Sequence, residues 1–287
     1  MVEKVKIAGA QMEPVILEKE RNLSSCLEII ETAAGEGARL IVFPECALTG
    51  YCFSSMEESI PVCETIPGPS TEEILAACRR LNVYAVVGML EQDGGKYYNA
   101  AAFLGPSGLV GKHRKLHLPY LAVDRFVNHG NIPLTVYDTE LGRIGLGICY
   151  DLMFPEYSRV LALQGADIIV LPSNWPELFG ELCPDYVLPV RAVENLIYYA
   201  GINRVGEERG VKFFGRSKIA HWSGLALAEG EPYEEDIIYA DIEPETAREK
   251  YQVVTPGEME VDFTRDRRPE FYGPITRPLD DNPRIRS

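Results

Sequence analysis

The stretch that most constrains the fold covers residues 142–175, where an apolar segment ending at Cys149 is followed by a helical pattern and a second apolar segment at 167–171. Pro155 suits the first position of the intervening helix, and Gly165 suits its end. A strand, a helix and a second strand of this length predict a βαβ-like unit, and open α/β sheets build their sites at the carboxyl ends of such strands. The position of Cys149 therefore makes it a candidate nucleophile.

Composition narrows the classes of function. The chain has 287 residues, of which 46% are hydrophobic and 25% charged, as is usual for a globular protein with a substantial core. Its formal net charge of -15 argues against nucleic acid or an anionic membrane as a partner, because either would require a basic face. No apolar run is long enough for a membrane span, and the first residues lack a signal-peptide pattern, so we expect a cytosolic protein.

Cysteines and histidines form no recognisable metal or disulfide pattern. The seven cysteines are an odd number and include no CxxC pair, and the four histidines are scattered. We therefore expect reduced thiols and no metal site.

Strand and helix patterns alternate through most of the chain, without an internal repeat or a linker. Strands are predicted at 5–10, 39–43, 83–90 and 97–104, and a helix is predicted at 184–200. The second pair of strands is joined by a turn containing Asp93, Gly94 and Gly95, which is typical of a hairpin. Helices alternating with strands, together with hairpins, predict one α/β domain with mixed sheets over residues 1–287, with a polar tail from about residue 260.

Three reactive side chains follow apolar runs: Glu45 in IVFPE, Lys115 in KHRKLHLP and Cys149 in GICYD. Such ends could converge at one rim of a sheet. Together they supply what acyl transfer requires, because a thiol with a reference pKa of about 8.5 needs a base, and Glu45 could remove its proton. Lys115 and the backbone amide of Tyr150 would hold the charge on the former carbonyl oxygen. The protonated glutamate would then donate to the departing amine and later activate water.

At these residues the sequence resembles the nitrilase, or carbon–nitrogen hydrolase, superfamily. The matching segments, in the family's order from about residue 5 to residue 272, are FPECALTGY, HRKLHLP, GICYDLMFPE, LPSNWP, RAVENLIYYAGINRVG, FFGRSKI and RDRRPEFYG. The resemblance implies a four-layer α-β-β-α sandwich with two mixed sheets. It also implies Glu45 as the base, Lys115 as the oxyanion stabiliser and Cys149 as the nucleophile that forms a thioester. No cofactor is implied, and a homodimer or larger homo-oligomer is expected.

Two positions depart from the family's pattern. Many members carry a second glutamate in the loop after the lysine, and that position is Val123 here, with Asp124 beside it. Asp124 either replaces this glutamate or forms a salt bridge within the loop. The family's frequent arginine in the CYD segment is Met153 in this chain, so a polar contact found in other members is missing.

The resemblance also bears on the substrate. Tyr150 and Asp151 after the cysteine resemble the amidase and carbamoylase branches, whereas true nitrilases tend to have Trp and Glu there. We therefore predict hydrolysis of a small linear amide, with an N-carbamoyl amino acid or ureide as the alternative substrate. A nitrilase or a catalytically silent scaffold are further alternatives. The side chains that we expect to bind substrate are Tyr51, Tyr120, Asp124, Tyr150, Asn174 and Trp175.

Two rival interpretations involve different residues. A Cys–His hydrolase would use His113 or His117 as the base and would keep substantial activity without Glu45. A dinucleotide-binding module is suggested by GRIGLG at residues 142–147, but the glycines are spaced GxxGxG and lie inside the apolar run rather than after it. We therefore favour the Glu45-dependent hydrolase.

Overall fold

The computed structural model describes residues 4–179 and 181–278. The chain divides into two compact units, Met1–Arg248 and Glu249–Ser287. The second unit contains an antiparallel hairpin of β15 (Tyr251–Thr255) and β16 (Met259–Asp262), followed by two short 3-10 turns. All residues discussed as candidates for the site belong to the first unit.

The first large sheet of that unit has six strands in the order β14-β1-β2-β3-β4-β5. The strands β1, β2 and β3 run parallel, and the other neighbours pair antiparallel. Their bounds are β1 (Val5–Gln11), β2 (Leu40–Val42), β3 (Tyr84–Asp93), β4 (Lys96–Gly105), β5 (Gly108–Arg114) and β14 (Asp236–Ile242). The predicted hairpin at 83–104 is confirmed as β3 and β4.

The second large sheet also has six strands, in the order β13-β12-β9-β8-β7-β6. Here β7, β8 and β9 run parallel, and the remaining neighbours pair antiparallel. The bounds are β6 (Val136–Thr139), β7 (Gly142–Leu146), β8 (Ile168–Ser173), β9 (Tyr198–Asn203), β12 (Lys218–Ala220) and β13 (Ala226–Glu229). A separate hairpin joins β10 (Val205–Glu208) to β11 (Val211–Phe214).

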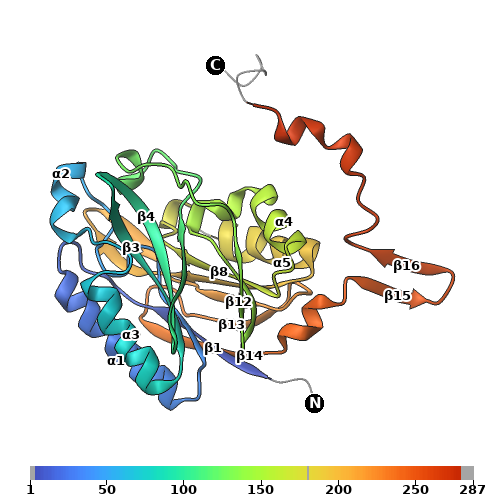
Figure 1. The fold of residues 1–287 in the computed structure, drawn as a ribbon, viewed down its shortest axis with the longest axis horizontal. Helices are drawn as coiled ribbons and strands as arrows, with labels where there is room; N and C mark the ends of the chain where they lie inside the picture. The colour runs from blue at the N-terminus through green and yellow to red at the C-terminus, as the bar shows by residue number, and fades with distance from the viewer. Residues whose placement is uncertain (1–3, 180, 279–287) are drawn as a thin grey trace. The chain divides into compact units, whose positions relative to one another are not determined.

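Helices cover the outer faces of the two sheets, as Figure 1 shows for α1 (Lys19–Gly35) and α3 (Pro69–Leu81) on one side and for α4 (Pro155–Leu163) and α5 (Leu188–Asn195) on the other. One apolar cluster joins α1 and α3 to the first sheet through residues such as Ile30 and Ile41. A larger cluster joins the two sheets and includes Ile7 and Ile202. The predicted four-layer α-β-β-α sandwich with two mixed sheets is confirmed.

The two sheets share one pattern of connections. In the first sheet, β1, α1, β2, α3, β3, β4 and β5 follow each other along the chain, and in the second sheet β7, α4, β8, α5, β9, β12 and β13 do the same. In both, two helices connect three parallel strands, and two antiparallel strands complete the series. The repeat lies in the topology rather than in recurring residues, which is why the sequence shows none.

One predicted helix is partly wrong. Instead of a continuous helix at 184–200, the structure has a π-helix (Leu182–Val187), α5 and the buried strand β9. Leu196 adopts a left-handed conformation with φ of 49°, which ends the helix. The apolar run continues through this turn because β9 is buried on both faces, so periodicity alone extended the helix too far.

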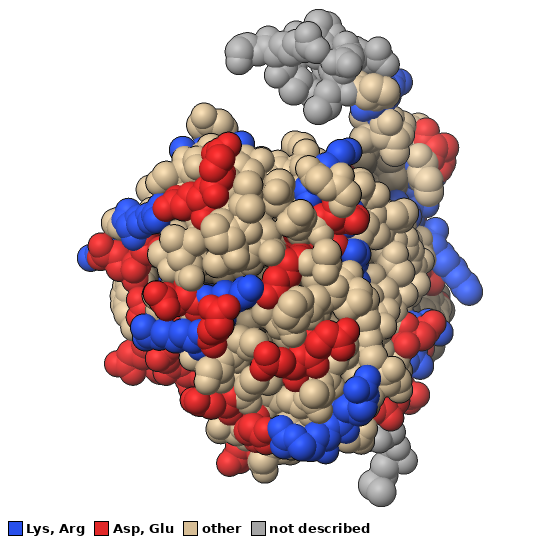
Figure 2. Space-filling view, turned by 60° about the vertical axis from the view of Figure 1, so that its left-hand side comes forward, with Lys and Arg blue, Asp and Glu red and all other residues tan. Residues whose placement is uncertain are grey.

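Charged groups are mixed over the surface. On the face shown in Figure 2, acidic side chains are interspersed with basic ones. Within the described part of the chain, every helix is too short or too polar to span a bilayer.

Candidate active site

Glu45, Lys115 and Cys149 follow β2, β5 and β7, respectively. The first two strands belong to one sheet and β7 belongs to the other, so the site is built from both sheets and the expectation of a single sheet rim is wrong. Gly88 of β3 makes the path after β2 possible, because a Cβ there would lie 2.4 Å from the carbonyl oxygen of Pro44 and 2.7 Å from the Cα of Glu45. The chain therefore turns directly against β3 and carries Glu45 into the interior.

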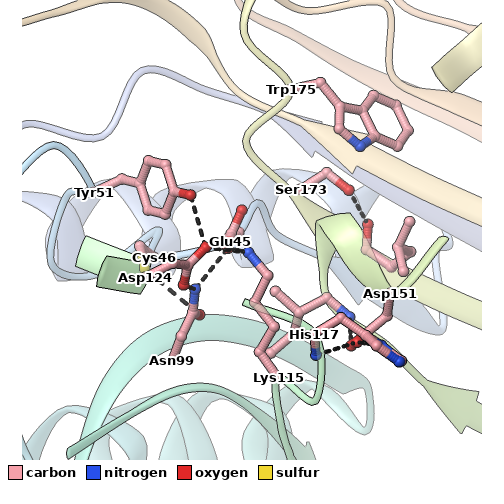
Figure 3. A network of polar contacts seen from close by, with 12 residues as sticks. Glu45, Cys46, Tyr51, Asn99, Lys115, His117, Asp124, Asp151, Ser173 and Trp175 are labelled. Carbon is pink, nitrogen blue, oxygen red and sulfur yellow. Dashed lines mark hydrogen bonds and ion pairs between the residues drawn. The ribbon is translucent and has the colours of Figure 1, made fainter. Parts of the chain in front are cut away.

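Lys115 is the centre of a buried ionic cluster (Figure 3). Its Nζ donates to Glu45 Oε1 at 2.7 Å and to Asp124 Oδ2 at 2.5 Å. Asn99 Nδ2 donates to the same Glu45 oxygen at 2.6 Å and to Asp124 Oδ1 at 2.9 Å, and the hydroxyl of Tyr51 donates to Asp124 Oδ2 at 2.8 Å. Asp124 thus contacts the lysine, which favours its role as a replacement for the family's second glutamate over a salt bridge within its loop.

One hydrogen-bond donor of Lys115 and one hydrogen-bond acceptor of Glu45 are available to a substrate. An ammonium has three protons, and the two carboxylates take one each, so Lys115 has one left for a substrate oxygen. Oε2 of Glu45 is buried and has no hydrogen-bond partner in the described part of the chain. The cluster can therefore accept a proton at one point and stabilise a negative charge at another.

Burial and neighbouring charges set the protonation states. Burial raises the pKa of Glu45 above its ordinary value, although Lys115 opposes this shift. Burial alone would lower the pKa of Lys115, but the charges of Asp124 and Glu45 raise it well above the usual range, so this residue is an ammonium. Burial and the charge of Glu45 raise the pKa of Cys149, which therefore rests as a thiol. The sulfur needs a base, and the charges of Glu45 and Lys115 both act on it.

Cys149 occupies a sharp turn between β7 and α4. It begins a short 3-10 helix (Cys149–Met153) with φ of 45°, a left-handed conformation that is strained for a residue other than glycine. The backbone amide of Asn174, just after β8, hydrogen-bonds to the sulfur and lowers its pKa, opposing the effect of burial. Two neighbouring strand ends of the second sheet thus hold the nucleophile.

Asp151 fastens this turn to the segment that carries Lys115. Its Oδ2 accepts from the backbone N–H of Ile148 at 3.1 Å and lies 3.0 Å from His113 Nε2. Its Oδ1 accepts from the backbone N–H of His117 at 3.1 Å and lies 2.7 Å from His117 Nδ1. Because the two histidines flank Lys115 in sequence, this carboxylate joins nucleophile and ammonium across the two sheets. Both histidines are partners of Asp151, and the rival in which one of them is the base stays a prediction to be tested.

Strong hydrogen bonds determine the charge of Asp151. Burial alone would raise its pKa, but the hydrogen bonds and charges of His113 and His117 lower it well below the ordinary value. Asp151 is therefore a carboxylate throughout the neutral range.

A second buried ion pair fixes the loop that carries Tyr51. Arg204 Nη1 donates to Glu208 Oε2 at 2.8 Å, and Glu208 Oε1 accepts from the backbone amides of Tyr51 and Cys52 at 2.9 and 2.5 Å. Because the Tyr51 hydroxyl donates to Asp124, this pair supports one side of the ionic cluster.

A narrow pocket opens onto Cys149. Among the predicted binding residues, Tyr51, Tyr150, Asn174 and Trp175 line it. Tyr120 does not, since its side chain is 91% exposed, whereas the residues on either side of it line the pocket. The backbone N–H of Leu121 donates to the carbonyl oxygen of Pro119 at 2.8 Å, so Tyr120 lies at the tip of a tight turn and its side chain is directed into solvent.

Two features of the site were not predicted from the sequence: Asn99, and the role of Asp151 with its two histidines. A buried amide in the otherwise apolar strand YYNAAAFL is an available signal, because a buried polar side chain requires partners. In the described residues, no group of three or more His, Cys, Asp or Glu side chains is arranged to hold a metal ion.

A known family matches most of the chain. The family model for carbon–nitrogen hydrolases matches residues 6–252. The chain belongs to the carbon–nitrogen hydrolase family. The resemblance inferred from the seven sequence segments is thereby confirmed.

Relatives of this carbon–nitrogen hydrolase cover nearly its full length. It is 39% identical to a nitrilase of Pyrococcus abyssi, over 93% of this chain and 99% of the relative. It is 30% identical to omega-amidase NIT2 of Danio rerio, over 94% and 96% of the two chains. The chain is thus an enzyme of the amidase and nitrilase type.

Solved structures confirm the fold. A carbon–nitrogen hydrolase from Helicobacter pylori G27 superposes with a TM-score of 0.83 at 22% identity, over 96% of this chain and 99% of the other. An amidase from Nesterenkonia sp. gives a TM-score of 0.75 at 23% identity, over 93% and 95%.

Proposed function

We propose that this hydrolase cleaves the C–N bond of a small linear primary amide through a thioester on Cys149 and releases ammonia and a carboxylic acid. The observation that carries the proposal is the unpaired, buried Oε2 of Glu45 beside an ammonium with one proton still to donate. Hydrolysis of an amide needs a proton acceptor that becomes a donor, and this oxygen can perform both tasks.

In the acylation half, Glu45 takes the proton of the Cys149 thiol as the sulfur attacks the carbonyl carbon. The carbonyl electrons move onto oxygen, where Lys115 Nζ and the backbone N–H of Tyr150 stabilise the negative charge. Collapse of this intermediate breaks the C–N bond, and the proton on Glu45 passes to the departing nitrogen. Ammonia leaves, and the acyl group stays on the sulfur.

In the deacylation half, Glu45 is a carboxylate again and takes a proton from water as the water oxygen attacks the thioester carbon. Lys115 and Tyr150 stabilise the second oxyanion. The C–S bond then breaks, the sulfur recovers its proton from Glu45, and the carboxylic acid leaves. One water is consumed for each amide, and the enzyme returns to its resting thiol.

The test is a substrate panel combined with mass spectrometry. The purified protein is incubated with aliphatic amides, ω-amides, N-carbamoyl amino acids and nitriles, and ammonia release is measured. We expect the amides to be turned over, with the acyl mass on the peptide that contains Cys149 and not on the one that contains the half-buried Cys63. Cys149→Ala should abolish turnover, and Lys115→Met should lower kcat by about 10²–10³.

Three results would count against the proposal. Turnover by Cys149→Ala, or turnover without an acyl adduct, would exclude the thioester route. A strong preference for N-carbamoyl amino acids would move the substrate to the ureide class.

We also propose that the chain works in the cytosol as a homo-oligomer. The seven free cysteines support a reducing compartment. Exposed apolar side chains on neighbouring helices α4 and α5, among them Val160, Leu163, Val190 and Val193, support association with a second copy. Light scattering after size-exclusion chromatography should give at least twice the chain mass, and a monomer at micromolar concentration would contradict this.

A further inference from the structure

Two residues that line the pocket beside Cys149 carry unpaired buried polar atoms. Asn174 Nδ2, Asn174 Oδ1 and Trp175 Nε1 are buried and have no hydrogen-bond partner among the described residues. Both residues line the pocket, and their exposed fractions are 1% and 2%. Native proteins contain few such atoms, so three on two successive residues call for an explanation. A bound ligand with complementary polar groups provides one.

Trp175 is held rigidly. The backbone N–H of Trp175 donates to Asn203 Oδ1 at 2.7 Å, and Asn203 Nδ2 donates to the carbonyl oxygen of Trp175 at 3.3 Å. The indole ring packs on Gly201, where a Cβ would lie 2.7 Å from the ring carbon Cη2. The indole N–H of Trp175 therefore has little freedom to find a partner within the protein, whereas the neighbouring Asn174 side chain can turn towards a ligand in the pocket.

The same pocket offers no positive charge to a ligand's far end. Among the described residues that line it there is no lysine, arginine or histidine, and Met153 forms part of its wall. The nearby Arg191 is engaged with other groups, since it donates to the carbonyl oxygens of Leu152 and Met153 and to Glu194. Lys115 is held by two carboxylates. A ligand carboxylate would be buried here without a counter-ion, which is unfavourable.

We propose that the pocket selects short, uncharged carboxamides whose acyl chain carries a second neutral polar group, such as another carboxamide, and that it disfavours carboxylates at this position. A second carboxamide matches the unpaired atoms, because its N–H can donate to Asn174 Oδ1 while its oxygen accepts from Asn174 Nδ2 and Trp175 Nε1. This inference rests on the proposed amidase function and specifies its substrate class.

Three nearly isosteric amides test the inference. Malonamide carries a neutral second carboxamide, malonamate carries a carboxylate, and isovaleramide carries two methyl groups at the same place. We expect kcat/KM for malonamide to exceed that for the other two by about a hundredfold, because a site with buried hydrogen-bonding groups discriminates against ligands that leave them unpaired. Succinamide, succinamate and 4-methylpentanamide repeat the comparison with a chain one carbon longer.

Two substitutions separate the contributions. Asn174→Leu should bring the ratio of malonamide to isovaleramide down towards one, because the preference depends on the amide of Asn174. Met153→Arg should raise kcat/KM for malonamate by about tenfold or more, since it supplies the missing charge. Leu109→Arg on β5 adds the same charge at a partly exposed position away from the pocket and should leave the ratios unchanged.

The outcomes distinguish this inference from the proposed function. If no amide releases ammonia in a Cys149-dependent way, the proposed function fails and this inference fails with it. If amides are hydrolysed but malonamate and succinamate are turned over as well as the diamides, only this inference is overturned. A malonamide to isovaleramide ratio that Asn174→Leu leaves unchanged would also overturn it, because Asn174 would then contact only the reacting amide.

Discussion

The two oxygens of the Glu45 carboxylate have different surroundings. Oε1 accepts from Lys115 and Asn99, whereas Oε2 is unpaired. We expect Glu45→Gln to lower kcat/KM by about 10²–10⁴, because a side-chain amide cannot accept the thiol proton. Steady-state ammonia release measures the loss.

Glutamine has nearly the same shape as glutamate, and its oxygen can still accept from Lys115. The thermal unfolding midpoint of this variant therefore checks that the loss is chemical rather than structural. A variant that keeps most of its activity would favour the rival in which His113 or His117 is the base.

Asp124 affects the acid limb of the pH profile. Burial, and then the charge of Asp124, raise the pKa of Glu45, so the base form is lost as the pH falls through this raised value. Asp124→Asn removes that charge, and the acid limb of kcat/KM should move to lower pH. A limb that stays in place while kcat falls would assign Asp124 to positioning Lys115 alone.

Among single residues, the reactive side chains were easier to predict from the sequence than the residues that hydrogen-bond to them. Glu45, Lys115 and Cys149 follow apolar runs, and strand ends are where sites form. Asn99 lies within a strand, and its contacts with Glu45 and Asp124 join residues far apart in the chain. Such contacts depend on how the strands align, which local patterns do not specify. The exposure of Tyr120 likewise depends on the path of its loop.

Among the secondary-structure elements, the turn after β7 depends on Asp151. Asp151→Asn places a donor where the carboxylate accepts, so at least one of its four partners loses its hydrogen bond. We expect the free energy of unfolding to fall by about 1–3 kcal/mol at neutral pH. Chemical denaturation measures it, with the exposed Asp138→Asn as a control expected to change stability by less than about 0.5 kcal/mol.

The difference in free energy of unfolding between wild type and Asp151→Asn should depend on pH. Because the pKa of Asp151 is lowered in the folded chain, its contribution to stability is complete above the unfolded value of about 3.9 and declines as the pH falls below it. Wild type and Asp151→Asn should therefore converge in stability in acid. A constant difference down to low pH would show that geometry alone matters.

Helices and strands that begin or end at a proline or a glycine were predicted well. The boundary between a helix and the apolar strand that follows it was not. Pro155 marks the start of α4, and the turn at Gly94 joins β3 to β4. In contrast, the apolar residues that follow α5 belong to β9, which is buried on both faces and therefore lacks the alternation that marks a half-buried strand. The turn at Leu196 adopts a conformation that leucine does not signal.

For the whole molecule, the large apolar clusters lie within Met1–Arg248. We therefore expect a chain that ends at Arg248 to fold, with circular dichroism close to that of the full chain and a cooperative thermal transition. Loss of that transition would show that residues 249–287 are needed for the fold. A smaller mass by light scattering with an intact transition would assign these residues to the proposed assembly.

The pairing of two topologically similar sheets was not predictable from composition or periodicity. Residues such as Ile7 and Ile202 bring the sheets together, and both read only as core positions in the sequence. The four-layer arrangement was predicted from the segments that resemble the family. Local sequence patterns indicate that a sheet forms, but they do not indicate which other sheet it packs against.

The division of the reacting groups between two sheets means that Cys149 meets Glu45 and Lys115 only once the two sheets have packed together. A nascent chain has a sulfur like any other free thiol, with neither proton acceptor nor ammonium beside it. Packing of the two sheets against each other brings Glu45, Lys115 and Cys149 together in the buried site.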